Sequence, residues 1–178
     1  MAPRSVTGVL LVGGASRRFG SPKALARFQG EQLAERAHRT LMEAFETVIA
    51  VGKEADRLPL PFPVHDDGSE TRAPIVGVAA ALRLVEGDIA VCLPTDMPFV
   101  SAGFLRALAE AAREADAAMP STGPLPGAYR RTVLSVLERR IEAGELALRD
   151  ALRELRTCVV DANERELRNV NTRDDLVA

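Results

Sequence analysis

The chain has 178 residues, and we expect a single domain over residues 1–178, because two domains would fit this length poorly. Apolar residues make up 47% of it and charged residues 27%, a globular balance that excludes an extended disordered chain. The 23 basic and 25 acidic residues leave a net charge of -2, so the sequence lacks the basic surplus typical of nucleic-acid-binding proteins.

The N-terminal segment and the two cysteines indicate a cytoplasmic protein. No apolar run approaches the ~18 residues that a membrane span needs. Glycines and arginines interrupt the first apolar stretch too early for a signal peptide. Cys92 and Cys158 are too few for a disulfide framework and lie in apolar runs, so we expect buried, reduced thiols. We therefore expect neither membrane nor nucleic-acid partners.

Short apolar runs alternate along the chain with longer amphipathic stretches. In chain order, the pattern predicts a strand over 6–12, a helix over 33–45, a strand over 48–51, an extended piece over 62–64, a helix over 74–85, a strand over 88–93, a helix capped by Ser101 that runs to 115, a strand over 117–119, helices over 131–142 and 145–155, a strand at 159–160 and a short helix from 172. Strands that are continuously apolar are typical of parallel sheets covered on both faces. We therefore predict an α/β fold of three layers, a mostly parallel central sheet with helices on both faces.

The loop after the first strand has the composition of a phosphate site. Gly13 and Gly14 allow a tight turn and a close approach of backbone N–H groups to an anion. Ser16, Arg17 and Lys23 add a hydroxyl and positive charge. The spacing matches neither the P-loop nor the dinucleotide fingerprint. An ordinary glycine-rich connection is the alternative, but glycines and cations together after a buried strand favour phosphate binding.

Lysine is rare in this chain, which has 23 basic residues but lysine only at positions 23 and 53. A lysine that persists among so many arginines is a hint that a compact point charge is needed. We apply this reasoning to Lys23 and interpret Lys53 as a surface lysine without a role. We also expect the turn formed by Asp66, Asp67 and Gly68 to be exposed.

Two further loops carry polar side chains. Asp96 lies between Pro94 and Pro98, just past the 88–93 strand, where a parallel sheet binds ligands. A carboxylate there suits Mg²⁺ bound together with phosphates, although an Asp that bonds its own turn is equally compatible. Asn169 and Asn171 flank an apolar residue and would face one side of a strand, but taken alone this segment favours a cap or turn before the last helix.

Taken together, these segments resemble the molybdenum cofactor guanylyltransferase family over nearly the whole chain. The resemblance is carried by the order and spacing of Leu-Val-Gly-Gly-Ala-Ser-Arg-Arg-Phe-Gly at 11–20 with Lys23, Ala-Pro-Ile-Val-Gly at 73–77, Pro-Thr-Asp-Met-Pro-Phe at 94–99, Pro-Leu-Pro-Gly-Ala-Tyr-Arg at 124–130 and Asn-Val-Asn-Thr-Arg-Asp-Asp-Leu at 169–176. It implies a Rossmann-like nucleotidyltransferase fold and an enzyme that moves GMP from GTP to the molybdopterin-type cofactor, with Mg²⁺, and releases pyrophosphate. It also implies a molybdoenzyme or another cofactor-biosynthesis protein as partner.

The resemblance also implies roles for individual residues. The residues expected to bind the nucleotide are Leu11, Val12, Gly13, Gly14, Ser16, Arg17, Lys23, Asp66 and Asp96. Of these, Arg17, Lys23 and Asp96 are expected to be catalytic, and Asp96 to hold the metal. Asn169 and Asn171 are expected on the acceptor side.

Two departures from the family pattern leave other activities open. Gly52 ends the second strand, where the family often has Asn, so we expect one polar contact to the nucleotide to be missing. The segment 119–124 is short, which affects the acceptor pocket. The alternatives are a cytidylyltransferase acting on the same cofactor, another small-molecule nucleotidyltransferase, and a non-catalytic relative that only binds nucleotide.

Overall fold

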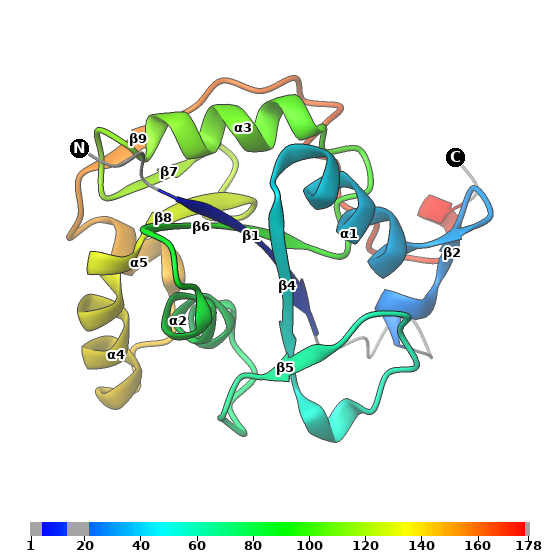
Figure 1. The fold of residues 1–178 in the computed structure, drawn as a ribbon, viewed down its shortest axis with the longest axis horizontal. Helices are drawn as coiled ribbons and strands as arrows, with labels where there is room; N and C mark the ends of the chain where they lie inside the picture. Colours follow the sequence, from blue (N-terminus) through cyan, green and yellow to red (C-terminus); the bar gives the residue numbers. More distant parts are fainter. Residues whose placement is uncertain (1–4, 14–21, 177–178) are drawn as a thin grey trace.

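The frame of the protein is a seven-stranded sheet between two layers of helices (Figure 1), in a computed structural model that describes residues 5–13 and 22–176. The strands are β1 (Val6–Val12), β4 (Thr47–Gly52), β5 (Val64–Asp66), β6 (Ile89–Pro94), β7 (Ala117–Met119), β8 (Gly127–Arg130) and β9 (Thr157–Val159), in the order β5-β4-β1-β6-β8-β7-β9. All neighbouring pairs are parallel except those of β8, which runs antiparallel to β6 and β7. The predicted three-layer α/β fold is confirmed.

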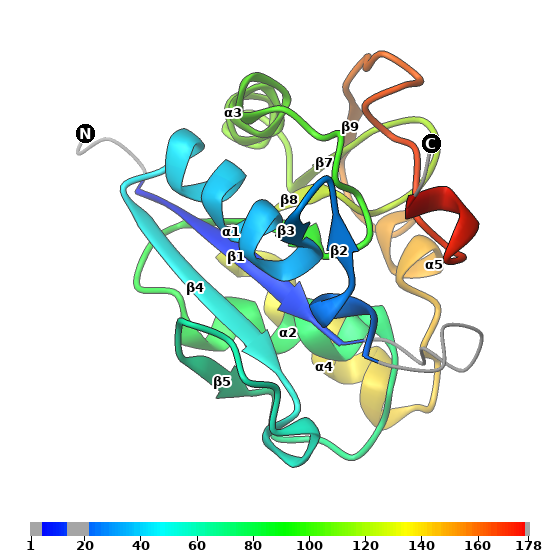
Figure 2. The ribbon, with the colours of Figure 1, turned by 90° about the vertical axis from the view of Figure 1, so that its right-hand side faces the viewer.

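Helices cover both faces of this sheet. They are α1 (Leu33–Ala44), α2 (Pro74–Leu84), α3 (Ala102–Ala111), α4 (Leu134–Glu142) and α5 (Leu148–Leu152). Figures 1 and 2 show α1 and α3 on one face and α2, α4 and α5 on the other. Alternate residues of β1 enter the two cores, because Leu10 and Val12 belong to the core under α1 and α3, and Val9 and Leu11 to the core under α2.

Most predicted elements begin and end within a few residues of the observed ones. Ser101 caps α3 as expected, its hydroxyl oxygen accepting a hydrogen bond from the backbone N–H of Phe104. The helix predicted over 145–155 is shorter, and the segment predicted as a terminal helix forms only a 3₁₀ turn at Asp174–Leu176. Strand β8 and the small hairpin of β2 (Arg27–Phe28) and β3 (Glu31–Gln32) were not predicted.

Strand β1 lies where the direction of chain winding reverses. From β1 the chain proceeds outward through β4 to β5, and α2 then carries it back across to β6 on the other side of β1. After β6 the chain continues away from β1, to β7 and β8, so the loops that follow β1 and β6 lead in opposite directions along the sheet. In sheets of this kind, ligands bind in the crevice between two such loops. Both loops that the sequence singled out, after Val12 and after Pro94, start at this edge.

The two cysteines differ in environment. Cys92 is fully buried in β6, and burial raises the pKa of its thiol. Cys158 in β9 is only partly buried, so the expectation of a buried thiol is wrong there. Within residues 5–13 and 22–176, every helix is too short or too polar to cross a membrane.

The close approach of β4 to β1 at the cavity edge yields a test of this packing. A Cβ on Gly52 would lie 2.4 Å from the backbone oxygen of Val12, so the two strands would have to separate. We expect Gly52→Ala to lower the free energy of unfolding by about 1–3 kcal/mol, the cost of overpacking, as measured by urea denaturation.

Gly77 provides the matched control. A Cβ there would meet only the flexible side chain of Leu11, at 3.4 Å, and Gly77 lies inside α2. Because alanine is the better helix former, we expect Gly77→Ala to raise stability by up to about 1 kcal/mol. Equal effects of the two variants would contradict this description of the β1–β4 contact.

Candidate active site

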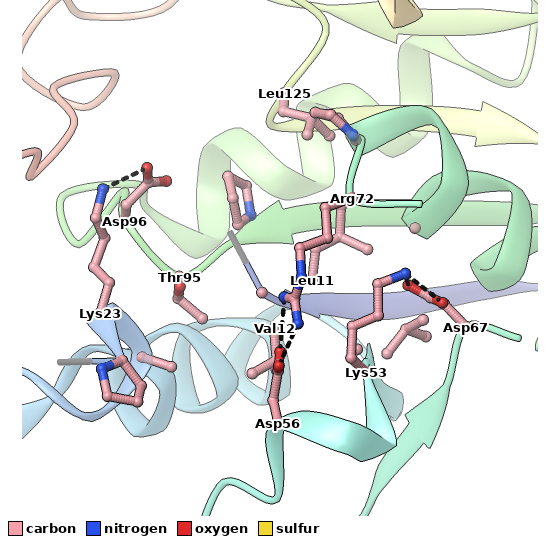
Figure 3. A pocket seen from close by; sticks show the side chains of 18 of the residues that line it. Leu11, Val12, Lys23, Lys53, Asp56, Asp67, Arg72, Thr95, Asp96 and Leu125 are labelled. Carbon is pink, nitrogen blue, oxygen red and sulfur yellow. Dashed lines mark hydrogen bonds and ion pairs between the residues drawn. The ribbon is translucent and has the colours of Figure 1, made fainter. Parts of the chain in front are cut away.

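A cavity of about 690 Å³ lies at the carboxyl edge of the sheet, between the ends of β1, β4 and β6 and the beginning of α2 (Figure 3). This volume is in the usual range for small-molecule sites. The lining residues are Leu11, Val12, Gly13, Pro22, Lys23, Ala24, Val51, Gly52, Lys53, Asp56, Leu58, Asp67, Thr71, Arg72, Ala73, Pro74, Gly77, Pro94, Thr95, Asp96, Met97, Leu125 and Asn169. Charged side chains gather at its two ends.

One end of the cavity is formed by Lys23 and Asp96. Lys23 belongs to a 3₁₀ turn after β1, and Asp96 follows β6. The ammonium Nζ lies 3.3 Å from Oδ2 of Asp96, and both side chains are partly exposed, by 20% and 24%. The structure thus brings together two of the residues predicted to be catalytic (Figure 3).

The C-terminal segment packs against the loop that carries Asp96 and is hydrogen-bonded to its backbone. The backbone N–H of Val170 donates to the backbone oxygen of Asp96 at 2.8 Å. Val170 is fully buried and packs with Phe28 and Leu33. This anchor brings its neighbour Asn169 to the cavity wall.

Asn171 is exposed and does not line the cavity. Its backbone N–H donates to Asp175 Oδ2 at 2.8 Å, in a local turn. The segment around Val170 forms no strand, so Asn169 and Asn171 do not share a face as a strand would require. The cap or turn expected for this segment is confirmed, and an acceptor-side role for Asn171 stays a prediction.

The other end of the cavity contains a buried ion pair. Lys53 Nζ lies 2.8 Å and 2.7 Å from the two carboxylate oxygens of Asp67 and also donates to the backbone oxygens of Ser69, at 2.5 Å, and Thr71, at 2.8 Å. The side chains of Lys53 and Asp67 are only 10% and 8% exposed. The expectation of a surface lysine and an exposed Asp67 is therefore wrong.

A second ion pair lies at the rim of the same end. Arg72 binds both carboxylate oxygens of Asp56, at 2.6 Å and 3.2 Å, and the guanidinium holds the pKa of that carboxyl below its usual value. Arg72 is about half exposed, so solvent weakens this pair far more than the pair of Lys53 and Asp67.

Asp66 does not line the cavity, although it was predicted to contact the nucleotide. Its exposed carboxylate accepts hydrogen bonds from the backbone N–H groups of Glu54, at 2.8 Å, and Gly68, at 2.9 Å, and these bonds lower its pKa. Asp67, one residue further, points into the cavity instead. Neighbouring residues at the end of a strand point to opposite sides, so a shift of one residue exchanges the two positions.

The remaining predicted nucleotide-binding residues divide into two groups. Leu11, Val12 and Gly13 line the cavity with Lys23 and Asp96. Gly14, Ser16 and Arg17 lie outside the described residues.

The described residues contain no cluster of three or more His, Cys, Asp or Glu side chains that could hold a metal ion. Three carboxylates of the described residues line the cavity. Both oxygens of Asp67 accept hydrogen bonds from Lys53, and both oxygens of Asp56 accept them from Arg72. Lys23 donates to only one oxygen of Asp96, Oδ2. A single available carboxylate fits a cation such as Mg²⁺ that takes its other ligands from phosphates and water, and Asp96 is the residue that would hold it.

The chain is similar to known proteins over most of its length. The profile of the MobA-like NTP transferase domain matches residues 8–159. The chain is 33% identical to a "Molybdenum cofactor guanylyltransferase" of Pseudomonas syringae pv. syringae, over 92% of this chain and 88% of that protein. It is 35% identical to a "Probable molybdenum cofactor guanylyltransferase" of Bacillus subtilis, over 94% of this chain and 90% of that protein.

A solved structure is also similar over nearly its whole length. It is "Molybdopterin-guanine dinucleotide biosynthesis protein A" of Archaeoglobus fulgidus, with a TM-score of 0.83 and 27% identity, covering 96% of this chain and 95% of that one.

The anchoring role of Val170 yields a prediction for the Asp96 loop. We expect Val170→Ala to lower the free energy of unfolding by about 2 kcal/mol, because it removes buried methyl groups and leaves a cavity beside Phe28. Amide hydrogen exchange over residues 95–98 should accelerate as well, as measured by mass spectrometry.

Val159→Ala is the matched control, because Val159 is 54% exposed. Its effect on stability should stay within about 0.5 kcal/mol. Unchanged exchange over 95–98 in Val170→Ala would show that the C-terminal segment does not hold the loop.

Proposed function

The chain belongs to the MobA-like NTP transferase domain family and is a nucleotidyltransferase, and from that premise we propose that it transfers GMP from GTP to the molybdenum cofactor and releases pyrophosphate. The names of its relatives support guanine as the base and the cofactor as the acceptor. The observation in the structure that supports the proposal best is the pairing of Lys23 with Asp96 at the divergence of β1 and β6, inside a cavity large enough for a nucleotide.

The distribution of charge suggests how the nucleotide lies. At one end of the cavity, Lys53 and Arg72 each bind both oxygens of a protein carboxylate, whereas at the other end Lys23 contacts Asp96 through one oxygen, at the longer distance of 3.3 Å. We place the triphosphate at the other end, beside Lys23 and the loop after β1, and the uncharged base at the end with the matched pairs. Two of the lining residues, Gly52 and Gly77, have no side chain, so the cavity wall is flat where they lie. A planar base fits against such a surface.

Transfer of the nucleotidyl group depends on positioning the two substrates and on neutralising phosphate charge, and needs little proton transfer. The attacking group is a phosphate oxygen of the acceptor, which is already anionic, so no general base is needed. Lys23 is placed to bind the phosphates and to balance the negative charge that develops on the departing pyrophosphate. Asp96 would hold Mg²⁺, which, when bound, supplies further neutralisation of phosphate charge.

We propose that the acceptor enters past Asn169 and Leu125. Both line the cavity, Asn169 from the segment that supports the Asp96 loop and Leu125 from the turn before β8. From these positions an acceptor phosphate would approach the α-phosphate from the side of Asp96. Asn171 has no part in this proposal, because its backbone closes a turn outside the cavity.

Nucleotide choice is the first test of the proposal. The enzyme is incubated with the molybdopterin-type cofactor, Mg²⁺ and GTP, CTP or ATP in turn, and pyrophosphate release is measured. We expect GTP to give the highest kcat/KM. Faster turnover of CTP would make the protein a cytidylyltransferase, and GTP binding without pyrophosphate release would make it a non-catalytic relative.

Removal of the Asp96 charge tests the site itself. Asp96→Asn keeps the shape of the side chain, so the fold should survive. Its rate should fall by at least ~10²-fold, the usual cost of losing one preorganised electrostatic contact to the transition state. The measurement is pyrophosphate release as a function of Mg²⁺ concentration.

Asp88→Asn is the control, because Asp88 is exposed at the opposite end of the same strand, just before β6 begins. We expect it to leave the rate unchanged. If Asp96→Asn retained both the rate and the Mg²⁺ dependence of the wild type, the metal would lie elsewhere.

A further inference from the structure

Lys53 is the second of the chain's two lysines, and one loop surrounds its ammonium group. Asp67, Ser69 and Thr71 supply two carboxylate oxygens and two backbone oxygens, all between 2.5 Å and 2.8 Å from Nζ (Figure 3 shows the pair with Asp67). These acceptors occupy alternate positions of a single segment of chain. The segment is therefore wrapped around one positive charge.

A buried ammonium is tolerated only when its partners replace the water that it loses. At Lys53 they do, because the side chain is 10% exposed and a carboxylate and two carbonyl groups converge on it. A compact ammonium can donate to oxygens that converge on one point, whereas the planar fork of an arginine spreads its donors apart. This geometry favours a lysine at position 53 in a chain whose other basic residues, apart from Lys23, are arginines.

The ammonium connects the end of β4 to one wall of the cavity. Three more contacts reinforce this connection: the backbone N–H of Asp67 donates to Gly52 O at 2.8 Å, the backbone N–H of Glu54 donates to Asp66, and Arg72 pairs with Asp56. Beyond Arg72 the wall continues directly into Ala73 and the first turn of α2. Lys53, with four of these contacts at one atom, is thus the residue that binds most of the loop 67–71 to the end of β4.

We propose that Lys53 is a positioning residue for the base of the nucleotide: it holds the loop 67–72 in the shape that admits the base. The inference rests on the proposed function for the identity of the nucleotide. Lys53 acts through the loop, at the end of the cavity away from Lys23 and Asp96 (Figure 3). Its loss should therefore weaken binding of the nucleotide and its discrimination by base, while the chemical step remains.

The test measures binding and turnover separately in Lys53→Met. Titration with fluorescent mant-GTP gives Kd, and displacement by unlabelled GTP, ITP, ATP and CTP gives the base preference. We expect Kd for GTP to rise by about 10- to 10²-fold, the scale for a misplaced binding surface, and the preference for GTP over ATP to shrink. The kcat at saturating GTP should stay within about threefold, since the lost contacts act on binding.

A second variant separates positioning from folding. Lys53→Met alone leaves the buried carboxylate of Asp67 unpaired, which is itself destabilising. The double variant Lys53→Met/Asp67→Leu removes both charges, and replacing a buried ion pair by apolar side chains is often neutral for stability. We expect the double variant to be as stable as the wild type in urea and to show the same loss of GTP affinity.

Arg83→Gln serves as the control, because Arg83 forms an exposed pair with Glu138 between α2 and α4 and does not line the cavity. It should change neither Kd nor kcat. The inference is overturned if the folded double variant binds every nucleotide as the wild type does, or if its kcat falls while Kd is unchanged. A wild type that prefers CTP would refute the guanylyl proposal alone, and Lys53 would then be judged by the Kd for CTP.

Discussion

The pairing of β1 with parallel strands on both sides is the constraint on which the rest of the structure depends. In register, Leu11 lies opposite both Val51 of β4 and Pro94 of β6, so the three strands end at one level. The chain leaves β1 toward β4 and leaves β6 toward β8 and β7, which lie in the opposite direction along the sheet. A crevice therefore forms between the loops that follow these two neighbouring strands. A site at this edge follows from topology, before any particular side chain is considered.

The two ends of the cavity differ in how deeply their ion pairs are buried. The pair of Lys53 and Asp67 is almost fully buried and satisfied by the protein, so separating it would leave an uncompensated charge. The pair of Lys23 and Asp96 is longer, at 3.3 Å, and partly exposed to the cavity. Such a pair is weak and its members can exchange partners with a charged ligand. The same residue types therefore form a buried wall at one end of the cavity and a partly exposed pair at the other.

Elements and loops that depend on a local pattern could be predicted from the sequence. Features that depend on a contact between distant segments, or on which of two neighbouring residues faces the cavity, could not. Strands β1 and β6 and helix α2 were predicted closely because their apolar runs and prolines are local signals. Strand β8 was not, because a short strand is defined by pairing with β6 and β7. Spacing along the chain selected Asp66 where the structure uses Asp67 to line the cavity, since one residue changes the side to which a side chain points. Lys53, interpreted from the sequence as a surface lysine, is buried in an ion pair with Asp67, a contact that no local pattern indicates.

The end of the chain completes the site through contacts that no local pattern encodes. Val170 bonds the backbone of Asp96, and nearby Arg168 lies 4.9 Å from the centre of the Phe99 ring, which in turn meets Phe28 edge to face. The Asp96 loop is thus fixed between the hairpin that follows Lys23 and a segment more than seventy residues further along the chain. Two prolines stiffen the loop, but stiffness alone does not orient a carboxylate. Val170 of the C-terminal motif supports the Asp96 loop, and the same contact brings Asn169 to the cavity while Asn171 stays outside it.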